Sequence, residues 1–420
     1  MTTNVHNLTT PVNYNLTYVR CAAKVPSGSP RDCRTHGPQS CAVGTHNQEK
    51  ASRLPSTCRD IKNSSHLGLA RNRKMGNKDR KIEVRYYGGK KKLLSFIEAE
   101  IQSLNLPANS KFCDLFSGTA VVGRRFKQIG FSVTSNDYLV FAKCLATSRV
   151  GLNKRPGFPG LGFSPIDLLN ELPGKSGFFS KSYSPEGLEG RQYFSIGNAR
   201  RIDSIRAQIH QWHLLSQISD DENDYLISAL LEAMNRNSNV SGTYAAYLKN
   251  WDSRALKPLL IEEPVITPGT GKHTVHNEDA VKLASTITCD VLYLDPPYNA
   301  RQYSSNYFLL DVVARGWFQN EPEVRGITGM RDNSNLRSDF CSKKTASLAL
   351  RQIIESADAK YVVLSYNNEG IIPHSDLLEI MSTMGDLRIA EYKHRRYRAI
   401  NHDTSQKSTT EYLFILDKKE

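Results

Sequence analysis

Short runs of apolar residues that read as fully buried strands constrain the fold most strongly. Residues 290–295 (DVLYLD) and 361–366 (YVVLSY) are nearly continuous apolar runs rather than alternating ones. Such runs are typical of strands covered by helices on both faces of a parallel sheet. Four more stretches read as strands, namely residues 111–117, 132–137, 388–399 and 411–416. Helical stretches separate most of these strands, so the sequence predicts an α/β protein with a largely parallel sheet.

The chain divides into parts of different composition. Residues 1–80 are rich in Ser, Thr, Asn and Arg and lack apolar periodicity, which predicts a disordered basic extension. Met75 would be a sensible start for the folded part, which leaves the preceding residues as an inert or mis-assigned tail. Residues 81–150 and 276–420 carry the strands and are predicted to form the two parts of one sheet domain. Between them, residues 151–275 form an insert that is loop-rich at first and then helical over residues 198–215 and 222–235.

Composition limits the function classes. The net charge of +13 suggests a polyanionic partner, but residues 1–80 alone hold 13 Lys and Arg against 4 Asp and Glu. The sequence has no apolar run of membrane-spanning length and no signal-peptide pattern, so a cytoplasmic location is expected by default. None of the eight cysteines forms a C-x-x-C pair, and no histidine cluster accompanies them at zinc spacing. We therefore expect reduced thiols and no metal.

The tetrapeptide Asp295-Pro296-Pro297-Tyr298 follows directly on a buried strand. Ligands of open α/β sheets bind beyond the carboxyl ends of the strands, so this tetrapeptide is at the right edge. A conjugated exocyclic amine is a poor nucleophile. The Asp295 carboxylate and the Pro296 carbonyl could accept its two N–H bonds, and Pro297 adds a second ring that stiffens the turn. Tyr298 offers a face for an extruded base. The alternative is a Pro-Pro turn that merely ends a core strand.

Four other motifs are candidates for a cofactor site. A strand runs into a glycine-containing turn at Asp114, Phe116 and Gly118, where backbone can approach a ligand closely. Asp137, about twenty residues later, stands where a ribose diol would be held. Tyr86 and Lys90 flank two glycines before the first helix, where the alternative is a basic, solvated helix start. Asp279 could accept from an adenine amino group, or it could be a helix N-cap.

In this order the motifs resemble the adenine-specific DNA methyltransferases of the alpha architectural group, the class that includes the Dam enzymes and several restriction-system methylases. The resemblance covers residues 82–420. It implies a Rossmann-like sheet of S-adenosylmethionine-dependent methyltransferases with an inserted target recognition domain. Asp295, Pro296, Pro297 and Tyr298 would be the catalytic motif. The implied cofactor contacts are Tyr86, Lys90, Asp114, Phe116, Gly118, Asp137 and Asp279.

The resemblance extends to finer features. The run NARQY at residues 299–303 and the run YKHRRY at residues 392–397 look like a subset of restriction-system enzymes, with Tyr397 in the base pocket. Family members often have Gly where this chain has Ala120, and a methyl group there would narrow the cofactor cleft slightly. Residues 235–259 hold residue types that read base edges. The insert would meet phosphates through its basic residues: Arg149, Lys154, Arg155, Arg200, Arg201, Arg206, Arg236, Lys249, Arg254 and Lys257.

Three other functions remain open from the sequence. An RNA amino-methyltransferase also carries a Pro-Pro-aromatic motif, usually much closer to the glycine turn. A cytosine N4-methyltransferase more commonly has Ser in place of Asp295. A catalytically silent DNA-binding protein would share the scaffold. The resemblance to adenine-specific DNA methyltransferases implies double-stranded DNA as partner, a monomer, no metal, and a possible cognate restriction endonuclease. It also leaves room for a DNA-contacting tail within residues 1–80.

Overall fold

The computed structural model describes residues 86, 88–395 and 408–418. The predicted extension, residues 1–80, lies outside this part of the chain, and so does Tyr397. In the described part no helix is long and apolar enough to cross a membrane. The same residues contain no group of three or more His, Cys, Asp or Glu side chains placed to hold a metal ion.

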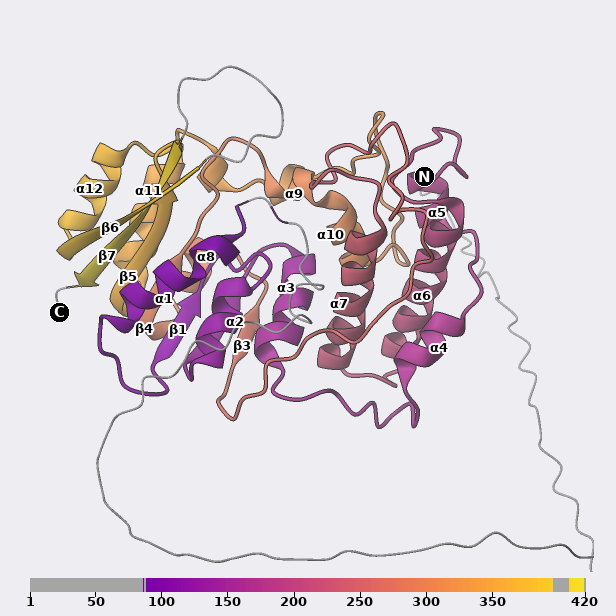
Figure 1. Ribbon diagram of the computed structural model, residues 1–420, viewed down its shortest axis with the longest axis horizontal. Helices are drawn as coiled ribbons and strands as arrows, with labels where there is room; N and C mark the ends of the chain where they lie inside the picture. The colour runs from indigo at the N-terminus through magenta and orange to yellow at the C-terminus, as the bar shows by residue number, and fades with distance from the viewer. Residues whose placement is uncertain (1–85, 87, 396–407, 419–420) are drawn as a thin grey trace, which may run out of the picture. The chain divides into compact units, whose positions relative to one another are not determined.

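The described residues form a sheet of seven strands in the order β3-β2-β1-β4-β5-β7-β6 (Figure 1). The pairs among β1 to β5 are parallel, whereas β7 runs antiparallel to both β5 and β6. The predicted α/β class and largely parallel sheet are therefore confirmed. The strands are β1 (Lys111–Asp114), β2 (Ser132–Asn136), β3 (Thr274–His276), β4 (Thr288–Leu294), β5 (Asp358–Asn367), β6 (Gly385–Arg395) and β7 (Ser408–Lys418).

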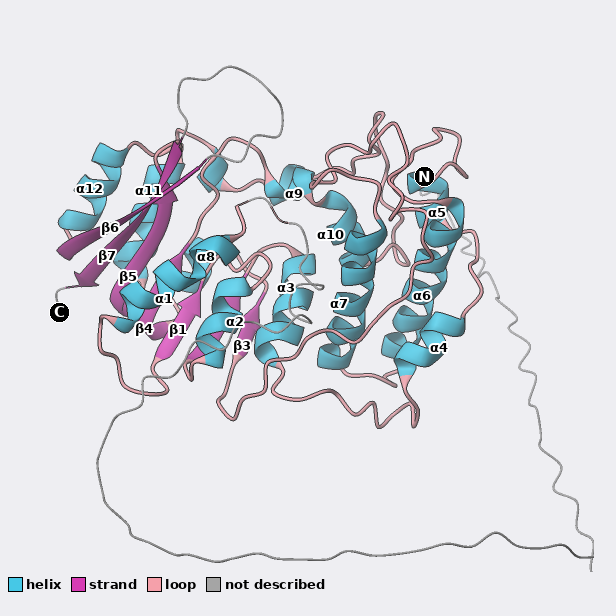
Figure 2. Cartoon of the chain, in the orientation of Figure 1, coloured by secondary structure: helices cyan, strands magenta, loops and turns pink. Residues whose placement is uncertain are grey.

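Helices cover both faces of the sheet (Figure 2). One face packs on η1 (Lys90–Leu93), α1 (Leu94–Gln102), α2 (Val121–Gln128) and the π-helix η2 (Thr147–Gly151). The other face packs on α8 (Ala280–Ala284), η4 (Asp339–Cys341), α11 (Ala346–Ser356) and α12 (His374–Ser382). Each face has its own hydrophobic core cluster, and side chains alternate between the faces. Phe112 belongs to the core cluster of the face covered by α1 and α2, whereas Cys113 belongs to that of the face covered by α11 and α12. Burial on both sides explains why β4 and β5 are continuous apolar runs.

A third core cluster lies among helices beyond the sheet, to the right in Figure 1. It joins the insert to α3 and α10, and its helices are α3 (Val140–Ala146), α4 (Pro165–Glu171), α5 (Phe178–Tyr183), α6 (Ile196–Leu214), α7 (Asp220–Asn237), α9 (Tyr303–Asn306) and α10 (Phe308–Arg315). A short 3-10 helix, η3 (Ser334–Leu336), follows α10. The helix α7 starts at a capping box, in which Ser219 accepts from the Glu222 amide and Glu222 accepts from the Ser219 amide.

The order of the strands sets the place of a ligand site. From β1 the chain proceeds outward to β2 and β3 on one side, whereas β4 leads outward to β5 on the other. The strand order thus reverses between β1 and β4. At such a point the connections leave the sheet in opposite directions, which opens a crevice beyond the carboxyl ends of the two strands. Asp114 ends β1 and Asp295 directly follows β4, so both carboxylates lie at this crevice.

Candidate active site

A cavity of about 1000 Å³, partly open to solvent, occupies the crevice. Every residue of the predicted catalytic motif and every predicted cofactor contact lines it except Pro296, which is buried. The lining residues come from residues 86–90, the end of β1, the end of β2, the turn after β4, the start of α8 and residues 337–340. The structure therefore brings together segments that are spread from residue 86 to residue 340 of the chain.

Asp295 and Lys90 form an ion pair at the cavity wall, with Asp295 Oδ1 3.0 Å from Lys90 Nζ. Lys90 opens η1 and its side chain is 3% exposed, so the basic, solvated helix start does not describe it. Burial lowers the pKa of Lys90, but the negative charges of Asp295 and Glu411 outweigh that effect and raise it. Burial also raises the pKa of Asp295, and the nearby Lys90 charge opposes this, which leaves it at about 6. The carboxylate is therefore mostly ionised at neutral pH but more basic than an ordinary Asp.

The turn after β4 is fixed by its neighbours. The backbone N–H of Ile371 donates to the Tyr298 carbonyl at 3.0 Å. The Tyr298 ring meets the Tyr366 ring edge-on at 6.3 Å, and Lys90 Nζ lies 5.5 Å from the Tyr298 centroid. Gly88 has φ +77°, and a Cβ there would come within 3.1 Å of the Tyr298 hydroxyl. The glycine before η1 thus allows Tyr298 to take its place in the cavity wall.

The turn after β1 carries a buried carboxylate. Asp114 is 1% exposed, and its Oδ2 accepts from the Gly123 amide at 3.1 Å. Burial raises its pKa to about 8, the Gly123 hydrogen bond lowers it, and the charges of Asp295 and Asp137 add to the increase. Gly118 has φ +50°, and a Cβ there would stand 2.9 Å from the Tyr86 ring. The missing side chain at Gly118 therefore lets the Tyr86 ring pack directly against this turn at the cavity edge.

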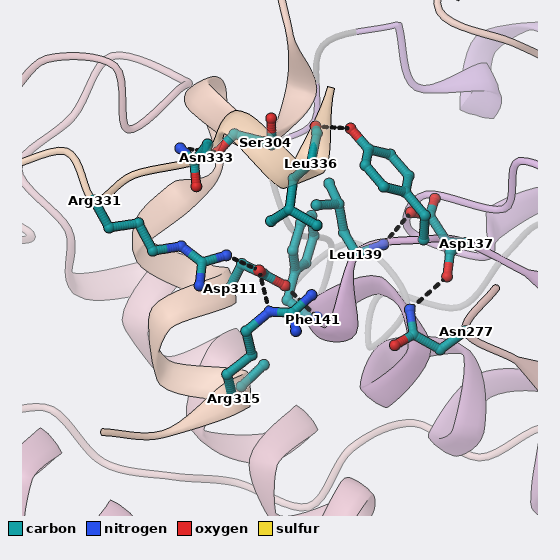
Figure 3. A network of polar contacts seen from close by, with 12 residues as sticks. Asp137, Leu139, Phe141, Asn277, Ser304, Asp311, Arg315, Arg331, Asn333 and Leu336 are labelled. Atoms are coloured by element: carbon teal, nitrogen blue, oxygen red, sulfur yellow. Dashed lines mark hydrogen bonds and ion pairs between the residues drawn. The ribbon is translucent and has the colours of Figure 1, made fainter. Parts of the chain in front are cut away.

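Asp137 follows β2 and organises the adjoining turns (Figure 3). Its Oδ1 accepts from the Leu139 amide at 3.0 Å. Its Oδ2 accepts from the Gly118 amide at 2.9 Å. Its carbonyl accepts from Asn277 Nδ2 at 2.7 Å. Burial raises the pKa of Asp137 to about 6 despite the two amide donors. Each carboxylate oxygen has a second lone pair, so these bonds leave acceptor capacity for hydroxyl groups of a ligand.

The carboxylates of Asp114, Asp137 and Asp295 make this wall of the cavity acidic, and Lys90 is the buried cation among them. Raised pKa values show that the protein alone does not stabilise the ionised forms fully. A ligand that carries positive charge would favour those ionised forms. The electrostatics of the cavity therefore suit a cationic ligand better than an anionic one.

The structure bears on two predictions for residues near the cavity, Asp279 and Ala120. Asp279 is the N-cap of α8, because its Oδ1 accepts from the amides of Val281 and Lys282, both at 3.1 Å. Its side chain also lines the cavity, so the cap does not remove it from the site. The expectation that Ala120 narrows the cleft is wrong, since Ala120 is fully buried in the core and does not line the cavity. Its φ of +55° explains why glycine would be favoured there.

A segment not foreseen from the sequence, residues 331–341, forms another wall. Arg337, Ser338, Asp339 and Phe340 line the cavity, and Phe340 meets Phe116 edge-on at 5.0 Å. The Ser338 amide donates to Gln302 Oε1 at 2.8 Å. No motif marks this segment in the sequence, because it is irregular and lies about forty residues after Asp295.

A polar network fixes the same segment to the helices behind the cavity (Figure 3). Asp311 of α10 is fully buried and accepts from the Phe141 amide at 3.3 Å, from Arg315 Nε at 2.8 Å and from Arg331. Asn333 Nδ2 donates to the Ser304 carbonyl at 3.3 Å. The start of α3, α10 and residues 331–341 are therefore held as one frame behind Asp137.

Two of the basic residues that were predicted to meet phosphates do not have that role. Arg149 and Arg206 are each 4% exposed, so neither can contact a phosphate on a duplex surface. Arg149 donates to the Thr119 carbonyl at 2.6 Å and pairs with Glu232 at 2.8 Å. Arg206 donates to the Val313 carbonyl at 2.8 Å. Both arginines instead connect the insert helices to the sheet domain and α10.

Several other predicted contacts are engaged within the fold. Arg201 donates to three backbone carbonyls, and Arg155 and Arg200 form surface ion pairs with Glu263 and Glu186. Asn239, inside the segment 235–259, is fully buried, and its amide bonds to the Leu248 carbonyl. Exposed basic side chains remain at Lys154, Lys249 and Lys257, which we call the insert lysines.

The chain matches known proteins over most of its length. Residues 86–380 match the family model of the D12 class N6 adenine-specific DNA methyltransferases. It is 38% identical to the modification methylase StsI of Streptococcus sanguinis over 80% of this chain and 52% of that protein. It is 36% identical to the type II methyltransferase M.NlaIII of Neisseria lactamica, over 80% and 99%. For the type II methyltransferase M.FokI of Planomicrobium okeanokoites the identity is 36%, over 80% and 53%. The chain thus spans about half the length of StsI and of M.FokI and nearly all of M.NlaIII.

Proposed function

Because the chain belongs to the D12 class N6 adenine-specific DNA methyltransferases, we propose that it methylates the N6 amino group of one adenine within a specific sequence of double-stranded DNA. The methyl donor is S-adenosylmethionine. The observation that carries the proposal is the Asp295–Lys90 pair at the carboxyl end of β4, facing the cavity that the cofactor motifs line. Family membership favours this activity over the RNA and cytosine N4 alternatives.

The residues of the cavity fit the proposed cofactor. Gly118 leaves the backbone of the turn after β1 bare at the cavity, where a ligand can approach it closely, and Asp137 would present acceptors for the ribose hydroxyls. Asp279 lines the same side, where an adenine amino group would meet an acceptor. The acidic wall complements the sulfonium and ammonium charges of the ligand. When bound, S-adenosylmethionine supplies a methyl group whose bond to sulfur breaks, with the electron pair left on sulfur, as the amine nitrogen forms its new bond.

The catalytic motif would act on the amine. The Asp295 carboxylate and the Pro296 carbonyl accept its two N–H bonds, which turns the nitrogen lone pair away from the purine ring and towards the methyl group. Tyr298 stacks on the base after it leaves the duplex. Asp295 takes up, or passes to water, the proton that N6 loses. A pKa of about 6 suits this duty, because the group is ionised at neutral pH and still basic.

We further propose that residues 151–275 form the target recognition domain, with the insert lysines as phosphate contacts. Two relatives are named type II methyltransferases, which favours a protective role beside a cognate restriction endonuclease. The proposal treats the enzyme as a monomer whose own residues line the whole cavity.

Methyl transfer tests the proposal. The protein is incubated with S-adenosylmethionine carrying a labelled methyl group and with unmethylated genomic DNA, and modified bases are mapped by long-read sequencing. We expect N6-methyladenine in one short recurrent sequence. The Asp295→Ala variant should lose turnover while it keeps DNA binding. DNA binding by the wild-type protein without transfer would instead support the silent DNA-binding alternative, and label on RNA alone would support an RNA enzyme.

A further inference from the structure

Glu411 is a buried carboxylate next to the catalytic pair that the mechanism above does not use. It lies near the start of β7, where it is paired with Asn367 of β5 and Tyr392 of β6. Its side chain is 9% exposed, and its Oε2 lies 3.5 Å from Lys90 Nζ. Lys90 Nζ is thus within ion-pair distance of two carboxylates, at 3.0 Å from Asp295 and 3.5 Å from Glu411.

Burying the Glu411 carboxylate in this arrangement costs folding free energy, which suggests that it has a role in the site. Removing a carboxylate from water carries a penalty that close pairing must offset. Among the described residues Glu411 Oε2 makes no hydrogen bond, and its contact with Lys90 is longer than the contact that Asp295 makes. A position on β7 that only supported the sheet would be occupied better by an apolar side chain, as Leu413 is on the same strand.

We infer that Glu411 is a positioning residue for Asp295: it holds the Lys90 ammonium between the two carboxylates and so limits how strongly Lys90 pairs with Asp295. The inference rests on the proposed function, in which Asp295 receives the amine. Without Glu411, Lys90 would pair with Asp295 alone and make it a weaker base. With Glu411, Asp295 keeps enough basicity to take a proton from N6 while Lys90 still keeps it ionised.

All the charged and titratable groups that face the pair bear on this balance. The negative charge of Glu411 raises the pKa of Asp295 against the lowering by Lys90, and both follow the larger effect of burial. The charge of Asp295 in turn raises the pKa of Asp114. The facing groups are Lys90 of η1, Asp114 of β1, Tyr293 of β4, Tyr298 of the catalytic turn and Glu411 of β7.

Glu411→Gln is the informative change, because glutamine keeps the shape and an acceptor oxygen but loses the charge. We expect the pKa of Asp295 to fall by about half a unit to one unit. The plateau of the single-turnover rate should fall by at most about threefold to tenfold, because a weaker base accepts the proton less readily. The matched control is Glu391→Gln on β6, an exposed Glu whose cross-strand partner is Tyr412, the neighbour of Glu411.

The test measures the ionisation of Asp295 without relying on activity. The full chain is labelled with ¹³C at the aspartate carboxyl carbons, and the Asp295 signal is assigned by its loss in Asp295→Asn. Its titration is compared in the wild-type protein, Glu411→Gln and Glu391→Gln, with thermal unfolding as a check on folding. A lower titration midpoint in Glu411→Gln alone supports the inference.

An unchanged midpoint in folded Glu411→Gln overturns the inference, even if the wild-type protein methylates DNA. A lowered midpoint in a protein that transfers no methyl group to DNA would leave the coupling in place and refute the proposed function. Single-turnover rates, compared with affinities for S-adenosylhomocysteine, then distinguish an effect of Glu411 on Asp295 from an effect on cofactor binding. A fall in the affinity of Glu411→Gln for S-adenosylhomocysteine that matches its fall in rate would place Glu411 in the cofactor site and also overturn the inference.

Discussion

Removing the charge of Lys90 should move the pH dependence of methyl transfer to higher pH. The Lys90→Met variant leaves a chain of similar length without an ammonium group, and Asp295 then loses its partner at 3.0 Å. In the proposed mechanism Asp295 acts in its ionised form, so the rate should be present above the pKa of Asp295 and be lost as the pH falls through it. In the wild-type protein this loss should centre at about pH 6.

The structure gives the size of the shift. An opposite charge in direct contact lowers the pKa of a carboxyl by about 1 to 3 units, so its removal should bring Asp295 to about 8. At pH 7 the ionised fraction would fall from about nine-tenths to about one-tenth, which predicts a roughly tenfold slower reaction. The rate should return towards the wild-type value at about pH 9.

The assay is the single-turnover rate at saturating S-adenosylmethionine and DNA, measured from pH 5.5 to pH 9.5. Saturation separates this effect from a loss of cofactor affinity, which calorimetry with S-adenosylhomocysteine measures directly. The control is Lys92→Met, two residues further on, which removes an exposed charge outside the cavity lining. A loss in Lys90→Met that is the same at every pH would refute the reasoning and leave Lys90 a purely geometric role.

Three other expectations follow from the site and its supports. Gly118→Ala should weaken S-adenosylhomocysteine binding at least about tenfold in calorimetry, because the positive φ and the Tyr86 ring 2.9 Å from the new Cβ force this turn to shift; equal affinity would contradict a role of the turn in cofactor binding. Glu232→Ala should lower the free energy of unfolding by about 3 kcal/mol in urea titration, because Arg149 would stay buried without its partner, and a change below about 1 kcal/mol would argue against it. Changing all insert lysines to Gln should reduce DNA affinity and the salt dependence of binding without affecting cofactor affinity, whereas an unchanged salt dependence would remove them from the interface.

Local pattern was sufficient for most strands of the sheet and for the motif residues that line the cavity. The continuous apolar run before Asp295 predicted a strand buried on both faces, and β4 is such a strand. The prediction missed β3, because three residues next to a loop-rich insert carry too little periodicity. It also placed Arg149 and Arg206 on a DNA-facing surface, since a sequence shows the charge of a side chain but not the direction in which it points.

The turns that are proposed to hold the cofactor were also predictable from local sequence. Glycines at positive φ and acids at strand ends have conformational requirements that short stretches of sequence express. Gly118 and Asp137 are examples, and a hydrogen bond joins them in the fold. The sequence predicted the turn and the acid separately, whereas the bond between them depends on β1 and β2 lying side by side.

The sequence by itself determined the α/β class, the acidic turn after β4 and the family to which these motifs belong. Only the tertiary structure decided that Lys90 pairs with Asp295 rather than facing solvent, and that Glu411 approaches the same ammonium from more than 300 residues along the chain. The physical reason is that propensity and periodicity act over a few residues. The pKa of a carboxylate depends instead on burial and on charges within a few ångströms, which strand order and packing bring into place.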